Sequence, residues 1–376
     1  MRRAWAGAGL ILVTGLLAAC NQLGPNIPPV QPANATSSPG ASPPVDTAGS
    51  VLQVSATAKA TTAQLGIQIF WHDVSDPALV KANADRLFDY AVGLGANSVG
   101  ISFPIFTDGA KPTKVYTKDP VTPSPDSLQT VIGEAKARGL RIMLRPVIDE
   151  TNIKDNAGSW RGSIKPRSMT SWFTSYQSAL MPYLKAAQTA HADSFVVASE
   201  LDSLVGQAAQ WRTLLAASAA AFNGRLAYAD NWGKWATGRP GVAGADPGLD
   251  AYPQLHLADT ATVPEISAAW TAWLQKRPAG LADTVVQEVG IAATPGAYKE
   301  PALWAAPGQT LAPQIQANWF AGACDAVRRL HMSGIYFWTV DVWAEPAKAA
   351  TYVSGSFIGR GDSAIKTCFA ASWPRQ

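Results

Sequence analysis

The chain has 376 residues, of which 47% are hydrophobic and only 15% are charged. This composition can supply the core of a large domain and excludes a strongly charged disordered protein. The formal net charge of +3 gives no electrostatic case for nucleic-acid binding. The four His residues are scattered and no Cys/His pair has metal-ligand spacing, so the sequence predicts neither a metal nor another cofactor.

Residues 1–19 have the features of an export signal. Two Arg residues follow Met1, and a stretch of small and apolar residues comes next. The sequence LAAC at 17–20 resembles a bacterial lipobox, which implies cleavage before Cys20 and lipidation of its thiol. An ordinary secretory signal with a chance Cys is the alternative. We therefore expect an exported lipoprotein that meets the membrane only through Cys20.

Residues 20–62 are rich in Pro, Ser, Ala, Thr and Gly and contain almost no charge. A segment of this composition cannot bury enough apolar surface to offset the entropy that it would lose on ordering. We expect a disordered N-terminal tether that holds the domain formed by residues 63–376 away from the membrane.

Beyond the tether, short apolar or β-branched runs alternate with longer amphipathic segments, which predicts alternating strands and helices. The expected strands are 66–71, 98–103, 141–147, 194–199, 225–231, 249–252, 284–288 and 335–340. The expected helices include 77–94, 125–138, 169–190, 206–222, 263–275 and 313–330. Eight strands separated by helices predict an α/β fold in which a parallel sheet closes into a single (β/α)8 TIM barrel.

Glycines mark the ends of three expected helices. Gly139, Gly224 and Gly334 each stand just before an expected strand, where a glycine in the left-handed conformation commonly ends a helix. The sequence therefore predicts positive φ angles at these three positions.

Two connections are unusually long, 148–168 after the third strand and 232–248 after the fifth. Both leave the carboxyl ends of strands, and this is the end of a barrel at which active sites are built. Long loops at that end are more often functional than decorative. The sequence therefore predicts a site at this mouth of the barrel.

Glu200 and Glu288 each close an apolar run, at the ends of the fourth and seventh expected strands. A carboxylate is costly to bury unless it is paired or used. Two carboxylates directed at one mouth fit the acid and nucleophile roles at a glycosidic bond, provided that their surroundings keep one protonated and the other ionised. Two unrelated salt-bridged carboxylates are the alternative.

These strand positions are where sugar hydrolases of clan A carry the acid/base and the nucleophile. Within that clan the sequence resembles glycoside hydrolase family 113, the β-mannanase family. The similar stretches are IMLRPV at 142–147, WRG at 160–162, ASEL at 198–201, YADNW at 228–232, LDAYP at 249–253, QEVG at 287–290 and GIYFW at 334–338. They occur in the expected order, and the Trp-Arg-Gly and Glu-Val-Gly pieces are the most specific.

The resemblance implies a retaining double displacement. Glu288 would attack the anomeric carbon, and Glu200 would protonate the leaving oxygen and then activate water. The two carboxyl groups would lie about 5–5.5 Å apart, as retaining enzymes require. Tyr252, near the end of the sixth strand, would donate a hydrogen bond to Glu288.

The resemblance also implies sugar-binding roles at the mouth. Trp338 in the eighth strand would form the floor beneath the sugar, and Asn231 and Trp232 would reach the substrate from the fifth strand. Clan A members usually have Asn directly before the acid/base, where it binds the sugar 2-hydroxyl, and this chain has Ser199 instead. The shorter side chain leaves the preference for mannose over glucose open.

Further candidates for substrate binding carry structural alternatives. Arg145 in the third strand would contact the substrate, or else form an ion pair with Asp149 or Glu150. Trp71, which ends the first strand, would bind sugar hydroxyls together with His72 and Asp73, or else these three residues form a structural network. Trp160 and Arg161 in the third loop would form a wall of a sugar subsite, or else pack the loop on itself.

Other aromatic residues differ in their expected environments. Trp232 and Trp235 flank a Gly-Lys pair and are expected to form an exposed sugar platform, whereas Trp343 and Glu345 are expected only to cap the barrel. Three aromatic residues at helical spacing are expected to pack in the core: Trp172, Phe173 and Tyr176.

Cys324 and Cys368 remain after Cys20 is set aside. In the oxidising compartment expected for an exported protein, they either pair and pin the C-terminal segment to the last barrel helix or stay as two buried thiols. The sequence leaves both alternatives open.

The sequence thus predicts a monomeric retaining glycoside hydrolase that needs no cofactor and acts on a β-linked polysaccharide or oligosaccharide, with β-1,4-mannan as the leading substrate. A surface-tethered carbohydrate-binding barrel without turnover is the alternative, and the presence of both carboxylates speaks against it. A metal-dependent hydrolase on the same fold is disfavoured because the sequence has no His-x-His pair.

Overall fold

The computed structural model describes residues 63–239, 241–304, 308–351 and 356–373. The predicted export signal, Cys20 and the tether lie outside these residues. Within the described part of the chain, no helix is long and apolar enough to cross a membrane.

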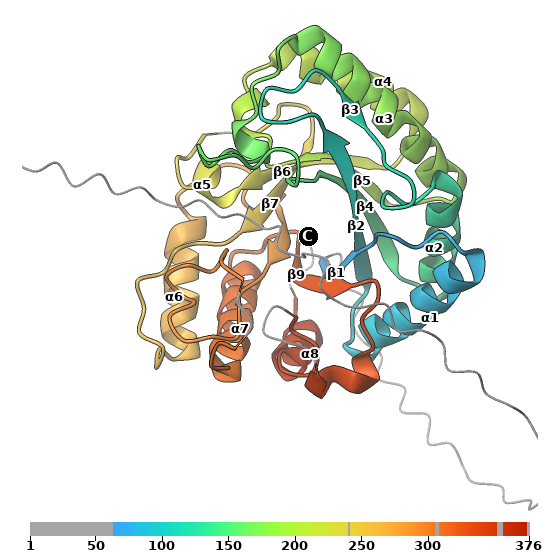
Figure 1. Ribbon diagram of the computed structural model, residues 1–376. Coiled ribbons are helices and arrows are strands. Elements are labelled where there is room, and N and C mark those ends of the chain that lie inside the picture. Colours follow the sequence, from blue (N-terminus) through green and yellow to red (C-terminus); the bar gives the residue numbers. More distant parts are fainter. Residues whose placement is uncertain (1–62, 240, 305–307, 352–355, 374–376) are drawn as a thin grey trace, which may run out of the picture.

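Eight parallel strands form a closed ring with the helices outside it (Figure 1). The ring closes because β1 (Gln64–Phe70) pairs with β2 (Ser98–Thr107) on one side and with β9 (Gly334–Asp341) on the other. The strands between them are β4 (Arg141–Ile148), β5 (Ser194–Ser199), β6 (Arg225–Asn231), β7 (Asp246–Ala251) and β8 (Val285–Val289). The predicted (β/α)8 barrel is confirmed, and all eight expected strands are present.

All six helices expected from the sequence surround the barrel, with ends that differ from the prediction by no more than two residues. They are α1 (Pro77–Gly93), α2 (Pro125–Ala137), α3 (Met169–Thr189), α4 (Ala208–Ala221), α6 (Val263–Leu274) and α7 (Pro313–Arg329). The prediction missed three elements: β3 (Val115–Tyr116), which pairs antiparallel with β2, the four-residue α5 (Trp232–Trp235), and α8 (Asp362–Ala370). The fifth repeat therefore carries only a short helix.

Local sequence explains where the first two helices begin. Pro77 and Pro125 occupy the first helical positions of α1 and α2, where the proline ring fits and no N–H is lost from the helix. The side chain of Asp76 accepts from two free N–H groups of α1, at 2.8 and 3.0 Å, and Ser124 accepts from one at the start of α2. These caps place each helix start immediately after the loop that leaves the barrel mouth.

The predicted role of the three glycines is correct only in part. Gly139 adopts the expected positive φ of 70°, but Gly224 and Gly334 do not. After α3 and α7 the left-handed position is taken by His191 and His331, with φ of 58° and 55°. Gly334 is needed for close packing instead, because a Cβ there would lie 2.4 Å from a backbone oxygen of β1.

The barrel interior is layered because side chains alternate along each strand. An apolar layer fills the amino-terminal end of the barrel: Met143, Val196, Ala227, Ala229, Val285 and Tyr336. Two residues further along the strands, Arg145 follows Met143 and Trp338 follows Tyr336, so the side chains become polar or aromatic toward the mouth. Gly66 makes room for this packing, since a Cβ there would lie 2.4 Å from the Tyr336 ring.

A second core lies between the barrel and its helices. Trp172, Phe173 and Tyr176 of α3 are buried in it, as the helical spacing predicted. The Tyr176 hydroxyl donates a 2.7 Å hydrogen bond to the carbonyl of Val197, which ties α3 to β5. This packing fixes the strand that leads directly to Glu200.

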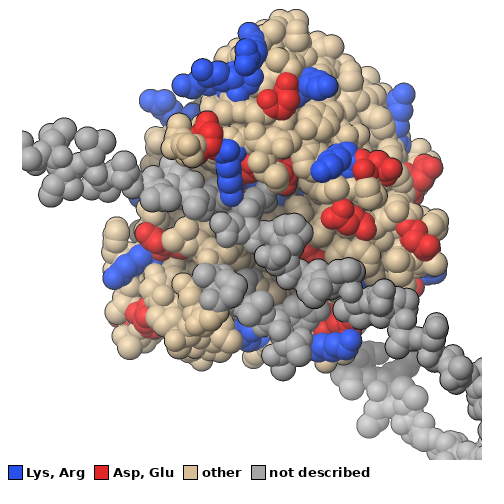
Figure 2. All heavy atoms as spheres, in the orientation of Figure 1, with Lys and Arg blue, Asp and Glu red and all other residues tan. Residues whose placement is uncertain are grey.

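Charged side chains are scattered over a mainly uncharged surface on the face shown in Figure 2, with several Lys and Arg side chains gathered at the upper left and more Asp and Glu side chains at the right. Arg138 forms ion pairs with Asp85, Asp89 and Glu134, which link α1 to α2.

Cys324 of α7 and Cys368 of α8 form a disulfide. Of the two alternatives left open by the sequence, the structure therefore has the cross-link. It fastens the last helix to the helix before it, across a sequence separation of 44 residues.

We expect the double variant Cys324→Ala/Cys368→Ala to lose about 4 kcal/mol in free energy of unfolding, the entropy contribution of a closed loop of this length. Urea denaturation without reductant measures this loss. Wild-type protein in excess reductant serves as the control and is expected to approach the stability of the variant. A variant as stable as the oxidised wild type would contradict a stabilising role for the disulfide.

Candidate active site

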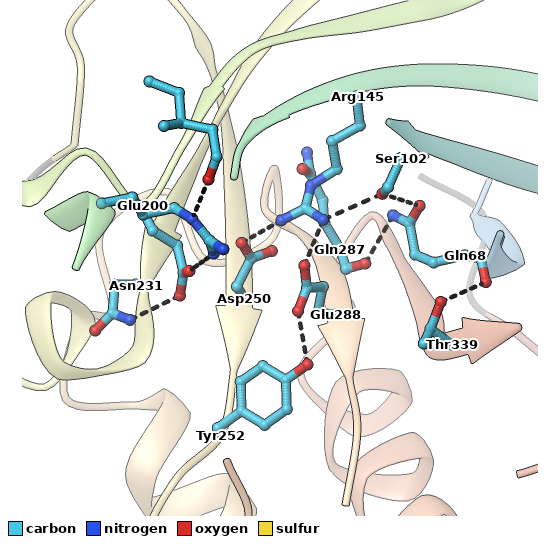
Figure 3. A network of polar contacts seen from close by, with 12 residues as sticks. Gln68, Ser102, Arg145, Glu200, Asn231, Asp250, Tyr252, Gln287, Glu288 and Thr339 are labelled. Atoms are coloured by element: carbon cyan, nitrogen blue, oxygen red, sulfur yellow. Dashed lines mark hydrogen bonds and ion pairs between the residues drawn. The ribbon is translucent and has the colours of Figure 1, made fainter. Parts of the chain in front are cut away.

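The structure brings Glu200 and Glu288 to the same end of the barrel (Figure 3). Glu200 directly follows β5 and Glu288 lies in β8, and only 1% and 4% of their surfaces are exposed. Burial is the main cause that raises the pKa of Glu200, and the negative charge of Glu288 raises it further, so the two carboxyl groups lie within electrostatic range of each other.

Glu288 is held from two sides. Arg145 of β4 donates to Glu288 Oε1 through its Nη1, and Arg145 Nη2 pairs with Asp250 Oδ2. The hydroxyl of Tyr252 donates to Glu288 Oε2 at 2.6 Å, as the sequence predicted. One guanidinium therefore serves two carboxyl groups, and Tyr252 fixes the orientation of one of them.

Glu200 has its own pair of donors. Arg161 Nη1 donates to Glu200 Oε2 at 2.8 Å, and Asn231 Nδ2 donates to Oε1 at 2.7 Å. Arg161 also lies 3.4 Å from Glu150 Oε1, and its Nε donates to the carbonyl of Ile148 at 3.0 Å. The backbone of Glu200 has φ of 58°, a conformation that is costly for a residue with a side chain and that tertiary contacts must maintain.

The charges in this region do not balance if every group is ionised. Arg145 and Arg161 face four carboxyl groups, which belong to Glu150, Glu200, Asp250 and Glu288, and the partly exposed Lys154 adds a third cation 3.9 Å from Glu150. Burial raises the pKa of Glu200 by more than Arg161 lowers it, and burial raises the pKa of Asp250 well above its usual range despite Arg145. Both shifts favour the protonated acid, so a proton on one of these groups would remove the excess negative charge.

Aromatic rings surround the carboxyl groups at the mouth. Phe70, Tyr252 and Trp338 form one buried cluster, and partly buried side chains pack against it: Trp160, Trp232, Ala302 and Trp304. We call these seven side chains the mouth ring. Such a surface offers apolar faces to the C–H faces of sugars, with carboxyl and amide groups close by for their hydroxyls.

The Trp-Arg-Gly loop places two members of the site at once. A Cβ on Gly162 would lie 2.3 Å from the ring of Trp160, so only glycine leaves room for that ring. Trp160 then joins the mouth ring while Arg161 turns inward to Glu200. The sequence analysis expected Arg161 to form a subsite wall or to pack the loop on itself. Neither alternative included its observed ion pair with Glu200.

Four predicted residues belong to the mouth ring, namely Trp160, Trp232, Tyr252 and Trp338, and Arg145 contacts one of them. Trp338 lies with its ring 5.6 Å from the guanidinium of Arg145, and the ring of Trp232 meets that of Tyr252 edge to face at 5.3 Å. Asn231 donates to Glu200 and accepts from the N–H of Gly233, where it begins α5, and its contact with the substrate stays a prediction.

Trp71 does not join the mouth ring. Its side chain is fully buried in the core between barrel and helices, together with Ile67 and Ile69. Phe70 points to the mouth instead, because successive strand residues face opposite sides of the sheet. The sequence analysis therefore assigned the mouth position to Trp71, whereas its neighbour Phe70 occupies it.

Two further expectations are wrong. Arg145 pairs with neither Asp149 nor Glu150, because its side chain points into the barrel toward β7 and β8. Trp235 does not form an exposed sugar platform, because its side chain is fully buried. Its Nε1 donates to a carbonyl oxygen of α6 at 3.1 Å, and the guanidinium of Arg277 lies 4.5 Å from the centre of its ring.

The sequence reasoning missed Asp250, Phe70, Trp304 and the role of Arg161. Asp250 carried a usable signal, because it is an acidic residue in an otherwise apolar run, two positions before Tyr252 and hence on the same face of the strand. No sequence pattern indicated Trp304, because it lies in a long loop without hydrophobic periodicity. Among the described residues, no three His, Cys, Asp or Glu side chains are grouped so as to hold a metal ion.

We expect Arg145→Met to lower the free energy of unfolding by about 3–5 kcal/mol near pH 7, because two buried carboxyl groups lose their cation. The loss should shrink near pH 5, because without Arg145 the pKa of Asp250 rises further and the folded variant takes up protons more readily than the folded wild type does. Urea denaturation at both pH values measures this, with the exposed Arg212→Met as control. An equal loss at both pH values would contradict the shared-charge account.

Several solved structures have the same fold. A GH113 β-1,4-mannanase complex aligns with a TM-score of 0.68 at 18% identity, over 82% of this chain and 99% of that chain. The GH113 β-mannanase of Alicyclobacillus acidocaldarius aligns with a TM-score of 0.65 at 20% identity, over 82% and 97%. An endo-β-1,4-mannanase from Thermotoga petrophila gives 0.51 at 12% identity, over 82% and 78%.

None of the curated protein sequences is significantly similar to this one. The sequence profile of Glycoside Hydrolase Family 113, however, matches residues 77–355. This range runs from the first helix to beyond the last barrel strand and includes both Glu200 and Glu288. Because the match spans most of the chain, the protein belongs to glycoside hydrolase family 113 and is a glycoside hydrolase.

Proposed function

We propose that this glycoside hydrolase cleaves β-1,4-linked mannan or a closely related polysaccharide with retention of configuration. The observation that carries the proposal is the pair of unlike carboxyl groups at one barrel mouth. The pKa of Glu200 is raised, while Glu288 is bound by a guanidinium and a phenol hydroxyl. Such a pair provides an acid and a nucleophile at the same pH.

In the first step, Glu288 attacks the anomeric carbon and forms an ester with the sugar. Glu200 gives its proton to the departing glycosidic oxygen, so the bond breaks without leaving an alkoxide. In the second step, Glu200, now ionised, takes a proton from water, and the hydroxide oxygen displaces Glu288. Arg145 and Tyr252 keep the nucleophile oriented through both steps.

The mannan assignment is supported by the mouth ring and by the kind of protein to which the fold is similar. Trp338, Trp160 and Trp232 offer ring faces around the two carboxyl groups. The neighbouring structures described above are of proteins named as β-1,4-mannanases. Ser199 stands where a longer amide is usual in the clan, so hydrolysis of glucomannan and cellulose should be assayed beside mannan.

The proposal extends to location. The sequence of residues 1–20 supports export and attachment to a membrane through a lipid on Cys20, with residues 20–62 as the tether and the barrel as a monomer. Cys20→Ser should release the exported protein from the membrane fraction. Release would be seen by fractionation, and unchanged membrane association of the variant would contradict this part of the proposal.

We expect Glu288→Gln and Glu200→Gln to lower turnover of the susceptible glycan by about 10³-fold or more, with the fold retained. Azide is expected to rescue Glu200→Gln in part on an activated aryl glycoside, because such a leaving group needs no acid. Rates on mannan, glucomannan, galactan and cellulose measure this, with the exposed Glu300→Gln as control. Wild-type turnover by the Glu200→Gln/Glu288→Gln double variant would refute the assignment.

Arg161 should set the pH range of the reaction. It lowers the pKa of Glu200, so Arg161→Gln is expected to raise that pKa further. The acid would then stay protonated to higher pH, and the basic limb of the profile of kcat/KM would move upward. The exposed Arg167→Gln serves as the control for lost charge. A basic limb that stays in place or moves downward would show that Arg161 does not tune Glu200.

A further inference from the structure

Trp343 differs from the other described tryptophans in its exposure. It is 41% exposed, whereas every other tryptophan in the described part of the chain is buried or half-buried. It follows β9, so it lies at the carboxyl end of the barrel, the same end as Glu200 and Glu288. Its indole therefore presents an apolar ring surface to solvent on this rim.

The backbone around Trp343 is rigidly anchored. Its neighbours Val342 and Ala344 are buried, and Arg86 of α1 donates to both of their carbonyl oxygens, at 3.1 and 2.9 Å. The N–H of Trp343 donates to Asp341 Oδ1 at 2.8 Å. The sequence prediction of a simple barrel cap does not account for an exposed ring on so firmly held a backbone.

Asp341 is fixed in turn by His72. His72 Nε2 lies 2.9 Å from Asp341 Oδ2, and its Nδ1 lies 2.7 Å from Asp73 Oδ2. Burial lowers the pKa of His72, but the two aspartates outweigh it and the pKa is raised, so the charged form and its ion pairs are favoured. The cluster at the end of β1 is therefore the structural network that the sequence left as one of two alternatives.

Contacts run without a break from the mouth ring to Trp343. Trp338 meets Phe70 edge to face at 6.2 Å, and Phe70 meets the ring of His72 at 5.3 Å. His72 then binds Asp341, which holds the N–H of Trp343. The five steps along the chain from Trp338 to Trp343 separate their Cα atoms by at most about 18 Å, a distance that a short oligosaccharide can bridge.

We propose that Trp343 is an outer sugar-binding subsite, whose exposed indole stacks on a pyranose ring of the glycan beyond the units held in the mouth ring. The proposal rests on the glycosidase function proposed above. An aromatic face matches the C–H face of a sugar. Three exposed polar side chains could bind the sugar hydroxyls: Asp73, which belongs to the His72 network, and Glu345 and Lys348, which follow Trp343 in the sequence. The rigid backbone reduces the entropy cost of binding.

The test measures binding rather than turnover. Full-length Glu288→Gln protein, with and without Trp343→Ala, is titrated by calorimetry with β-1,4-linked manno- and gluco-oligosaccharides from the disaccharide to the hexasaccharide. We expect Trp343→Ala to weaken binding of the hexasaccharide about tenfold and to weaken the disaccharide far less. Trp343→Phe keeps a ring face and should retain most of the affinity for the longer sugars.

Val92→Ala is the matched control, because Val92 is 47% exposed at the end of α1, at the opposite end of the barrel. It should bind sugars of every length like its parent. If Trp343→Ala also binds every length like its parent, the outer subsite is refuted and the proposed function stands. If no oligosaccharide binds the parent and wild type cleaves none, both proposals fall together.

Discussion

Two buried guanidinium groups govern this site. Arg145 and Arg161 lie inside the barrel mouth, and each needs carboxylate partners because an uncompensated buried charge is costly. Four carboxyl groups meet these two cations and the partly exposed Lys154, so the cluster is more stable when one of the acids keeps its proton. A site that holds protonated and ionised carboxyl groups side by side has the property that acid and nucleophile roles require.

The layers of the barrel make this arrangement possible. Below the charges lies a neutral polar layer, in which Gln68 donates to the carbonyl of Gln287 at 2.9 Å and accepts from Ser102 at 3.2 Å. Gly100 leaves room for the amide of Gln68, since a Cβ there would lie 2.1 Å from it. The polar layer separates the cations from the apolar end of the barrel and gives Arg145 a further contact through Ser102.

Catalytic groups and binding groups are built differently. The carboxyl groups are buried and held by hydrogen bonds from Arg145 in β4, Asn231 in β6, Arg161 in the loop after β4 and Tyr252 directly after β7, which fixes their orientation for bond cleavage. The aromatic groups stand in loops and at strand ends, where Gly162 and Asp341 fix the backbones that carry Trp160 and Trp343. Loops can thus vary which sugars are bound while the strands preserve the chemistry.

The sequence determined the barrel and the strand positions of Glu200 and Glu288. Alternation of strands and helices fixes the topology, and a parallel barrel brings the carboxyl ends of all its strands to one mouth. These features depend on patterns that are local in the chain, whereas the hydrogen bond from Tyr252 was implied by the family resemblance.

Only the tertiary structure determined which charged groups pair and which side of the sheet each side chain faces. Arg145 meets Asp250 across 105 positions of sequence, and no local pattern specifies such a pair. A shift of one residue at the end of β1 exchanges Phe70 for Trp71 at the mouth, because neighbouring side chains face opposite ways. Whether Trp235 or Trp343 is exposed depended on what packs over each ring, which only the folded chain decides.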